Sequence, residues 1–567
     1  MGRLIPRINL FIKLDLVVLF FLTVIILPTV TFLFRRGFFP MYDDMQVVRL
    51  WQMDKCIKDF QIPCRWVPDL GLGYGYPLFI FYAPLPYYLM EIVHLFGFSF
   101  INSVKLGFIL SIFFSGVFFY LFARNFFNKT ASLFVSFLYV YIPFRAASIY
   151  VRGAMGEAWG LAIIPFLFWG FENYLKNKGL KSGIIFSFTL ATFLITHNLS
   201  VFMFLPFFIF WILLRIYIAK VNFFYIKKII GFGLLGIGLS CFYLIPVIFE
   251  RNLVHLETLT SGYFGYLQHF ISLKQIFYSS KWGYGPSIPG PNDEVFLGIG
   301  PIHSFVALAG FISSIIAYRK KKVCLIFSIF LSAGFLFSAY LSHSRSTPLW
   351  QVFKFMEILQ FPWRFIMVAS FIASFLAGYL FEIFSKRLSL FFGFIIMIVT
   401  LGMYGNFFKP RVWFYITDSE KLSGESLKRQ LTASIYDFLP KTATRAPDEV
   451  ASSDLLQIKG EIETLEKRKG SNWFYYKVDV RSNNSTMAIP AYSFPHWKVR
   501  VNKDFVRTSP YGDLGSPSFS LENGIYTISA KLTKTLARII GDVLSASSLL
   551  ILLFLFYNDK KTRKINK

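Results

Sequence analysis

The chain has 567 residues, of which 55% are hydrophobic, 20% aromatic and only 16% charged. Soluble domains carry about a quarter charged residues, so this composition excludes an ordinary soluble protein. The formal net charge of +27 does not predict nucleic acid binding, because Lys and Arg gather in short clusters between long apolar runs. Such clusters orient membrane helices, with the basic loops on the cytoplasmic side.

The pattern predicts a polytopic α-helical membrane protein with about twelve transmembrane helices, since about 20 apolar residues cross a bilayer. The predicted spans lie near residues 14–34, 101–122, 130–147, 157–174, 182–197, 199–218, 228–249, 298–318, 323–341, 363–384, 388–408 and 536–557. Basic residues before the first span and after the last predict that both termini are cytoplasmic, in an integral plasma membrane protein. The first span lacks a small-residue cleavage site, so we expect it to be retained as an anchor.

The first outward loop, residues 35–100, opens with two adjacent acids, Asp43 and Asp44. Carboxylates this close to the membrane are costly, and no basic residue beside them in the sequence explains both. They are therefore predicted to be functional. Cys56 and Cys64 share the same loop and could form a disulfide there.

Two further parts of this loop have structural interpretations. Gly71, Gly73 and Gly75 are not a dinucleotide-binding fingerprint, because no strand precedes them and no helix follows. A tight turn with close backbone packing is predicted instead. The aromatic segment 78–97 contains prolines and the ionisable residues Glu91 and His94, so it is interpreted as a helix lying in the outer interface. Counting it as a span would place every later basic cluster outside.

The later outward loops add one carboxylate, one histidine and several arginines. Glu157 follows Arg145 and Arg152 in FRAASIYVRGAMGEAWG, at the mouth of a helix. Boundary arginines also anchor helices in the lipid headgroups, so both interpretations stay open. His197 and Asn198, in a THN break between two apolar helices, form a candidate polar site or a hydrogen-bonded structural pair. Arg364 begins another helix, in LQFPWRF.

The chain is predicted to form three parts: a transmembrane domain at 1–408, an extracytoplasmic β-rich domain at 409–535, and a final helix with a basic cytoplasmic tail at 536–567. Apolar and polar residues alternate with period two in the segment between the last two spans, which is typical of strands. The clearest strands are WFYYKVDV at 473–480, HWKVRV at 496–501 and GIYTISAKL at 524–532.

This arrangement resembles the membrane glycosyltransferases of the GT-C fold, in which an essential acid follows the first helix and interfacial helices come next. The chain is also similar to the membrane proteins called "6-pyruvoyl-tetrahydropterin synthase-related" and to YfhO-like proteins. The matching motifs are RWVPDLGLGYGYPLFIFYAPLPYYL, YVRGAMGEAWG, the THN break, LQFPWRF and AYSFPHWKVRVN. His496 stands where YfhO-like proteins have Gly in that last motif.

The GT-C resemblance implies transfer of a sugar from a polyprenyl-phosphate donor to an extracytoplasmic glycan, lipid or protein acceptor. By position, Asp44 or Asp43 would be the catalytic base of an inverting displacement, and membrane lipid would surround the site. Glu157 and Asp44 would hold a divalent cation, Mg or Mn. Arg65, Arg152 and Arg364 would bind the donor phosphate.

One alternative is a non-enzymatic transporter or assembly factor for lipid-linked saccharides or envelope polymers, and another is a degenerate transferase that only binds glycans through its β-rich domain. A transporter is expected to carry charged residues and broken helices deep in the bilayer, whereas the acids here gather at its predicted outer boundary. The acids therefore favour an enzyme.

Overall fold

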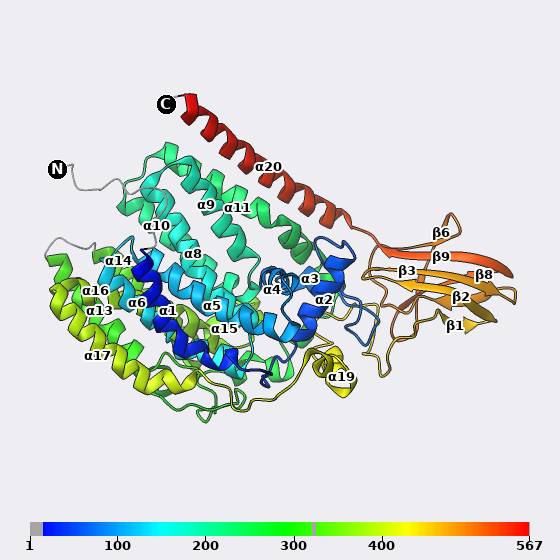
Figure 1. The fold of residues 1–567 in the computed structure, drawn as a ribbon, viewed down its shortest axis with the longest axis horizontal. Helices are drawn as coiled ribbons and strands as arrows, with labels where there is room; N and C mark the ends of the chain where they lie inside the picture. Colours follow the sequence, from blue (N-terminus) through cyan, green and yellow to red (C-terminus); the bar gives the residue numbers. More distant parts are fainter. Residues whose placement is uncertain (1–14, 320–324, 566–567) are drawn as a thin grey trace.

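The computed structural model describes residues 15–319 and 325–565, and it consists of a helical bundle with a β-rich domain at one end (Figure 1). The basic residues predicted to orient the N-terminus, and those of the cluster at 320–322, lie outside the described residues. The side chains of the C-terminal cluster, 560–567, are likewise not described.

Within the described residues, eight helices are long and apolar enough to cross a membrane. They are α1 (Leu16–Val30, continued by η1, Thr31–Phe34), α5 (Phe100–Ala123), α10 (Asn198–Ile218), α11 (Phe223–Glu250), α13 (Pro301–Arg319), α16 (Ile366–Ile383), α17 (Lys386–Tyr404) and α20 (Leu536–Ile565). The count rises to 10 if each of two bent helix pairs is one span. These pairs are α6 (Lys129–Val140) with α7 (Pro143–Ala146) and η2 (Ala147–Val151), bent by 44°, and α14 (Leu325–Leu341) with η7 (Ser344–Ser346) and α15 (Thr347–Val352), bent by 93°.

The predicted count of about twelve spans is not confirmed, although a helix lies at each predicted position. Two predicted spans correspond to α8 (Met155–Asn177) and α9 (Leu180–Leu194). The glutamates Glu157 and Glu172 lower the hydropathy of α8, and α9 has only 15 residues. A helix of that length rises about 22 Å, less than the roughly 30 Å of a hydrocarbon core.

The aromatic segment 78–97 is not among the candidate spans, in agreement with its interpretation as interfacial. It is divided into α3 (Leu78–Phe81) and α4 (Leu85–Leu95). Pro86 lies in the first turn of α4, where a missing N–H costs no helical hydrogen bond. The 11 residues of α4 rise only about 16 Å, too short to cross a bilayer.

The β-rich domain contains two antiparallel sheets with strand orders β1-β4-β8-β7 and β2-β3-β9-β5-β6. The strands are β1 (Leu456–Lys459), β2 (Ile462–Lys469), β3 (Trp473–Val480), β4 (Ser485–Ala488), β5 (Trp497–Val501), β6 (Asp504–Val506), β7 (Ser509–Tyr511), β8 (Ser516–Leu521) and β9 (Gly524–Leu532). The three strands predicted from alternation are β3, β5 and β9. Alternation identified them because their apolar residues face the buried side of a sheet while the others face outward.

Residues 409–455 precede the first strand and join no sheet. Leu431, in their first part, packs in the bundle core, whereas Leu439, Ala443 and Leu455, in their last part, pack in the core of the β-rich domain. This segment contains α18 (Asp418–Lys421) and α19 (Gly424–Thr432), and we call it the strap. An antiparallel bridge joins Phe414 of the strap to Phe38, and another joins Pro440 to Val254. In Figure 1 α19 lies below the first outward loop, apart from the sheets.

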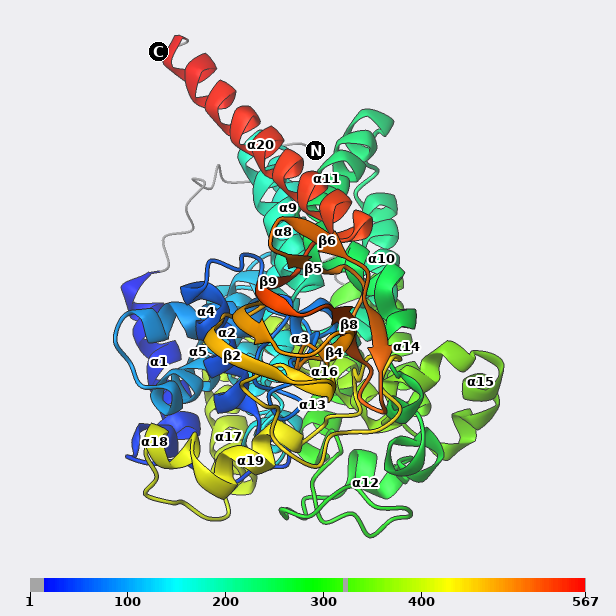
Figure 2. The same ribbon diagram turned by 90° about the vertical axis from the view of Figure 1, so that its right-hand side faces the viewer.

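The β-rich domain packs directly on the first outward loop, so the two lie at the same end of the molecule (Figure 2). The Trp66 ring contacts Trp497 edge-on at 5.9 Å between centroids, and Tyr74 contacts Tyr492 at 5.6 Å. Gly71 and Gly75 adopt positive φ angles of 67° and 82°. A Cβ on either would lie within 3 Å of Tyr492 or Trp66 respectively, which confirms the predicted tight turn.

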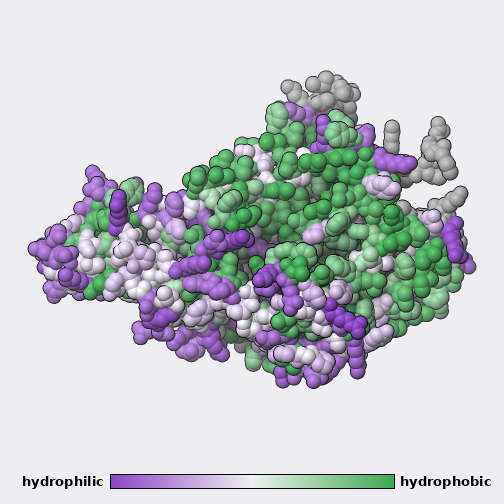
Figure 3. All heavy atoms as spheres, turned by 180° about the vertical axis from the view of Figure 1, so that it is seen from behind, coloured by the Kyte–Doolittle hydropathy of each residue, from purple (hydrophilic) through white to green (hydrophobic). Residues whose placement is uncertain are grey.

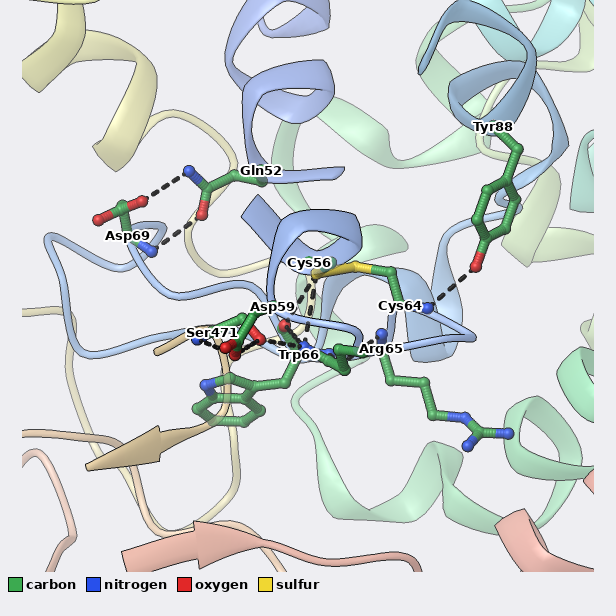
Figure 4. Close-up of a disulfide and its surroundings, with 10 residues drawn as sticks. Gln52, Cys56, Asp59, Cys64, Arg65, Trp66, Asp69, Tyr88 and Ser471 are labelled. Carbon is green, nitrogen blue, oxygen red and sulfur yellow. Dashed lines mark hydrogen bonds between the residues drawn. A yellow bond between two sulfur atoms is a disulfide. The ribbon is translucent and has the colours of Figure 1, made fainter. Parts of the chain in front are cut away.

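A disulfide and polar contacts stabilise this junction (Figure 4). Cys56 and Cys64 are bonded to each other, as the sequence allowed. Asp59, just after α2 (Gln46–Lys58), accepts a hydrogen bond of 2.8 Å from the backbone N–H of Ser471 in the β-rich domain. Disulfides persist in oxidising compartments, which is consistent with an extracytoplasmic loop.

Hydrophobic residues cover much of the bundle, whereas hydrophilic residues dominate the β-rich end (Figure 3). Large exposed apolar side chains recur along α10, α17 and α20. On a water-soluble protein such a surface would drive aggregation, but on a membrane protein it faces lipid. The chain is therefore an integral membrane protein with one large polar end.

Candidate functional site

The acids of the first outward loop lie against the short loop at residues 148–157, which we call the second outward loop. The backbone N–H of Asp43 donates to the carbonyl of Arg152 at 2.9 Å, and Tyr42 donates to Val151 at 3.1 Å. The side chain of Gln46 donates to the carbonyl of Gly153 at 2.9 Å. Two loops more than 100 residues apart in sequence are thus held together by three hydrogen bonds.

Asp43 is paired with a buried arginine. Its Oδ2 accepts hydrogen bonds of 2.8 Å from Arg49 and 2.9 Å from Gln46. The Arg49 side chain is only 5% exposed, and its guanidinium lies over the ring of Tyr82 at 4.6 Å. Removing one partner of such a pair leaves an uncompensated buried charge. Asp43 is therefore suited to positioning α2.

Asp44 faces a cavity of ≈ 500 Å³ between the first loop and the strap, which Asp43 also lines. Its Oδ2 accepts a hydrogen bond of 2.6 Å from Nζ of Lys421 in α18. Burial raises the pKa of Asp44 above its usual value, and Lys421 opposes this effect. The cavity lining combines apolar side chains with the two acids and two cations. Its main members are Phe38, Phe39, Tyr42, Asp43, Asp44, Phe414, Ile416, Lys421 and Arg429.

Glu157 lies behind these acids in an ion cluster. Both of its carboxylate oxygens bind the guanidinium of Arg152, and Oε1 also accepts a hydrogen bond of 3.1 Å from Nε of Arg364. The hydroxyl of Ser148 donates to Oε2 at 3.0 Å. The side chains of Glu157 and Arg364 are 2% and 8% exposed. Two arginines share one carboxylate here, so the cluster keeps one positive charge.

This geometry does not fit the divalent cation predicted on Glu157 and Asp44. A metal ligand needs a free lone pair directed at the ion, but each carboxylate oxygen of Glu157 already accepts two hydrogen bonds, from Arg152 and Arg364 at Oε1 and from Arg152 and Ser148 at Oε2. One oxygen of Asp44 likewise binds Lys421. No group of three or more His, Cys, Asp or Glu residues suited to a metal occurs in the described part of the chain.

The glycines of YVRGAMGEAWG explain how the second loop approaches its neighbours. Gly153 has a φ of +66°, and a Cβ there would lie 2.1 Å from the sulfur of Met41. A Cβ on Gly156 would lie 2.7 Å from the His197 ring, and one on Gly160 would lie 2.6 Å from Oγ of Ser200. Each glycine lets another element come close to the ion cluster.

His197 and Asn198 connect helices at the edge of this cluster. His197 caps α10, its Nδ1 accepting from the backbone N–H of Ser200 at 3.3 Å. The amide of Asn198 donates to the carbonyl of Phe81 at 2.8 Å and accepts from the hydroxyl of Tyr243 at 2.6 Å. Asn198 thus joins α10 to α3 and α11, and the structural interpretation of this pair is the better supported one.

Arg65 does not join the arginines around Glu157. Its guanidinium donates at 2.6 Å to Asp542 of α20 and at 3.1 Å to the carbonyl of Phe242 in α11. Arg65 thus fastens the first loop to the last helix, away from the Glu157 cluster, and its predicted role at the donor phosphate stays a prediction.

The strap supplies the residues that sequence reasoning did not assign to the site. Lys421 and Arg429 line the cavity beside Asp44, and Asp437 lines a smaller adjoining cavity with Arg49. Burial raises the pKa of Asp437 to about 6, although Arg49 opposes this effect. These residues lie in a polar segment that the sequence places with the β-rich domain, and no spacing in the sequence links them to Asp44.

Comparisons with known proteins leave the family open. No protein-family model matches the sequence. A curated relative, an uncharacterized protein from Lactococcus lactis subsp. cremoris (strain MG1363), is 27% identical over 329 residues, which are 55% of this chain and 52% of the relative. The chain thus spans about half the length of that relative. The family predicted from the motifs remains a prediction.

Similar solved structures include the oligosaccharyltransferase of Archaeoglobus fulgidus. Its apo crystal structure has a TM-score of 0.43 and 11% identity, covering 70% of this chain and 56% of that one. The structure titled as AglB with an inhibitory peptide and a dolichol-phosphate has a TM-score of 0.42 and 11% identity, covering 69% and 55%. TM-scores this low do not by themselves place the chain in that fold.

Proposed function

We propose that this protein is a membrane glycosyltransferase of the inverting type, which transfers a sugar from a polyprenyl-phosphate donor to an extracytoplasmic acceptor. One observation carries the proposal: Asp44 faces a cavity of ≈ 500 Å³ that also contains Lys421 and Arg429. Such a displacement needs a carboxylate to accept the proton and cations to stabilise the phosphate leaving group.

In the proposed reaction Asp44 is the general base. The acceptor hydroxyl gives its proton to the Asp44 carboxylate while its oxygen forms a bond to the anomeric carbon of the donor. The bond between that carbon and the phosphate oxygen breaks, and its electrons leave with polyprenyl phosphate. Because burial raises the pKa of Asp44, its carboxylate is a stronger base than an exposed aspartate.

The two cations of the strap are proposed to hold the leaving group. Lys421 neutralises Asp44 in the described conformation, and Arg429 interacts electrostatically with the same carboxylate. A donor phosphate entering the cavity would compete for both cations and free Asp44 to accept a proton. Phe38, Phe414 and Ile416 give the cavity apolar walls suited to the first isoprene units of the donor.

The ion cluster behind Asp43 is proposed to position the site. Arg152 and Arg364 share the charge of Glu157, so one positive charge remains to favour an anionic donor. The carbonyl of Arg152 accepts from the backbone of Asp43, which couples this cluster to the first-loop acids.

The test compares Asp44→Asn with Asp43→Asn in membranes supplied with labelled polyprenyl-phospho-sugars. The Asp44→Asn variant is expected to lose transfer by about 10²–10⁴-fold, the usual contribution of a general base. Asp43→Asn is expected to lose less transfer but more stability, because it leaves Arg49 buried without its acid.

The matched control is Asp479→Asn, on the outer part of the β-rich domain, which should change neither transfer nor insertion. Undiminished transfer by a normally inserted Asp44→Asn variant would rule out this mechanism. If that variant also kept its cellular function, the non-enzymatic alternative would be favoured.

A further inference from the structure

The outer face of the five-stranded sheet carries an open groove of ≈ 710 Å³ that the proposed transfer site does not use. Its lining is basic and aromatic and contains no acidic residue. The main lining side chains are Arg468, Trp473, Tyr475, Lys498, Arg500, Phe505, Ser529, Lys531 and Thr533.

The register of the sheet places these side chains in two rows. The first row crosses all five strands, since each residue pairs with the next: Arg468, Tyr475, Ser529, Arg500 and Phe505. With strands about 4.8 Å apart, this row is about 19 Å long. The second row pairs Trp473 with Lys531 and Lys531 with Lys498. Cations and aromatic rings therefore lie side by side in both rows, the first across all five strands and the second across β3, β9 and β5.

The cations of the groove are largely free to bind an anion. Arg468 pairs with Glu466 at 2.6 Å, but no salt bridge of Lys498, Arg500 or Lys531 occurs among the described residues. Arg500 lies over the Phe505 ring at 4.2 Å from its centroid. Such a contact holds the guanidinium in place and leaves its N–H edge free to bind an anion.

From this groove we infer a second binding site, for an anionic polysaccharide chain. Charge complementarity requires an anionic ligand, and the aromatic side chains suit sugar rings, whose C–H faces are apolar. The elongated row suits a chain rather than a single small anion. The groove lies on the domain that projects from the bundle, beyond the hydrophobic surface that faces lipid (Figures 1 and 3). This position favours a soluble polymer over a membrane surface.

The site is tested by binding to the full-length protein in nanodiscs, with fluorescent dextran sulfate as the probe and neutral dextran of equal length beside it. The double variant Lys498→Glu/Arg500→Glu is expected to raise the Kd for dextran sulfate about tenfold or more, because two attractive charges become repulsive. Tyr475→Ala should weaken binding by a smaller factor. The matched control, Lys459→Glu on β1 of the other sheet, should bind as the unchanged protein does.

Three outcomes would overturn the inference: equal Kd values for the double variant and the control, equal binding of neutral dextran, or binding of anionic phosphatidylglycerol vesicles without binding of dextran sulfate. Circular dichroism of each variant shows whether the β-rich domain is folded. Because this assay measures binding without sugar transfer, it can succeed or fail independently of the proposed reaction.

Discussion

At the residue scale, Gly153 determines how closely the two outward loops approach each other. Its φ of +66° is unfavourable for other L-residues, and it leaves room for Met41 beside the first-loop acids. Its carbonyl also accepts the hydrogen bond from Gln46. The role of this glycine in the YVRGAMGEAWG motif is therefore a close contact with the segment that carries Asp43 and Asp44.

Gly153→Ala is expected to lower the free energy of unfolding by about 2–4 kcal/mol. The new Cβ would strain the left-handed backbone and clash with Met41. Thermal unfolding in detergent measures the change, and transfer activity should fall with it. Gly97→Ala is the matched control, because Gly97 also has a positive φ but no atom of the described residues lies within 4 Å of its missing Cβ. Equal losses for both variants would show that the contact with Met41 does not contribute.

Two buried acids, Asp54 of α2 and Glu91 of α4, interact electrostatically. Glu91 is 2% exposed, and among the described residues neither of its carboxylate oxygens has a hydrogen-bond partner, nor has Oδ1 of Asp54. Burial and the charge of Asp54 raise the pKa of Glu91 to about 7. Protonated Glu91 is therefore favoured in the folded state.

A carboxyl group whose folded pKa is raised binds more protons when folded, so its stabilising effect is present at low pH and is lost as pH rises towards 7. Glu91→Gln is expected to raise the free energy of unfolding at pH 8 by on the order of 2 kcal/mol and to change it little at pH 5. Thermal unfolding at the two pH values is the measurement. A gain that does not depend on pH would mean that Glu91 is not protonated in the folded protein.

At the element scale, the strap is the feature that assembles the site. It begins after α17 and passes the first-loop acids before the first strand forms, bringing Lys421 to 2.6 Å from Asp44. Its two short helices could not fold stably alone, since isolated helices shorter than about 12 residues are marginal in water. Packing on the first loop is therefore what gives the strap its structure.

The disulfide between Cys56 and Cys64 crosslinks the first loop. The double variant Cys56→Ser/Cys64→Ser is expected to lose about 2–3 kcal/mol of stability through the added freedom of the unfolded loop. Melting with and without reductant measures this loss. Cys241→Ser is the control, because Cys241 is a free, buried thiol. A melting temperature insensitive to reductant would contradict the expectation.

At the scale of the whole molecule, the first loop, the strap and the β-rich domain form one polar end of a lipid-facing bundle (Figure 2). Helix α20 runs from this polar end to the opposite end of the molecule (Figure 1). Arg65 and Asp542 join the first loop to α20 at 2.6 Å. We propose that this polar end is extracytoplasmic.

Single cysteines introduced into a Cys241→Ser background test that orientation. A membrane-impermeant thiol reagent applied to intact cells is expected to label Lys459→Cys on β1 and not Lys220→Cys, in the turn between α10 and α11. Permeabilised cells should show labelling at both positions. Labelling of Lys220→Cys alone in intact cells would invert the proposed topology.

The sequence by itself determined the membrane class, the positions of the helices, the strands β3, β5 and β9 and the glycine turn. These features depend on local composition and periodicity, which a sequence displays directly. His496, which stands where Gly was expected from the resemblance, still adopts a φ of +74°, so the turn survives the substitution. The number of spans was less well determined. Whether α8, with two glutamates, and α9, with 15 residues, cross the membrane depends on the helices that pack against them.

Only the tertiary structure decided which charges meet. The sequence singled out Asp44, Glu157 and the arginines, but the fold pairs Glu157 with Arg152 and Arg364, sends Arg65 to Asp542 and brings Lys421 to Asp44. Ion pairs form between residues separated by up to 477 positions, as for Arg65 and Asp542, and no local pattern encodes such distances. The sequence shows which side chains are charged, but the packing of helices and loops decides which of them pair. Burying a charged side chain is favourable only where the fold places a counter-charge beside it.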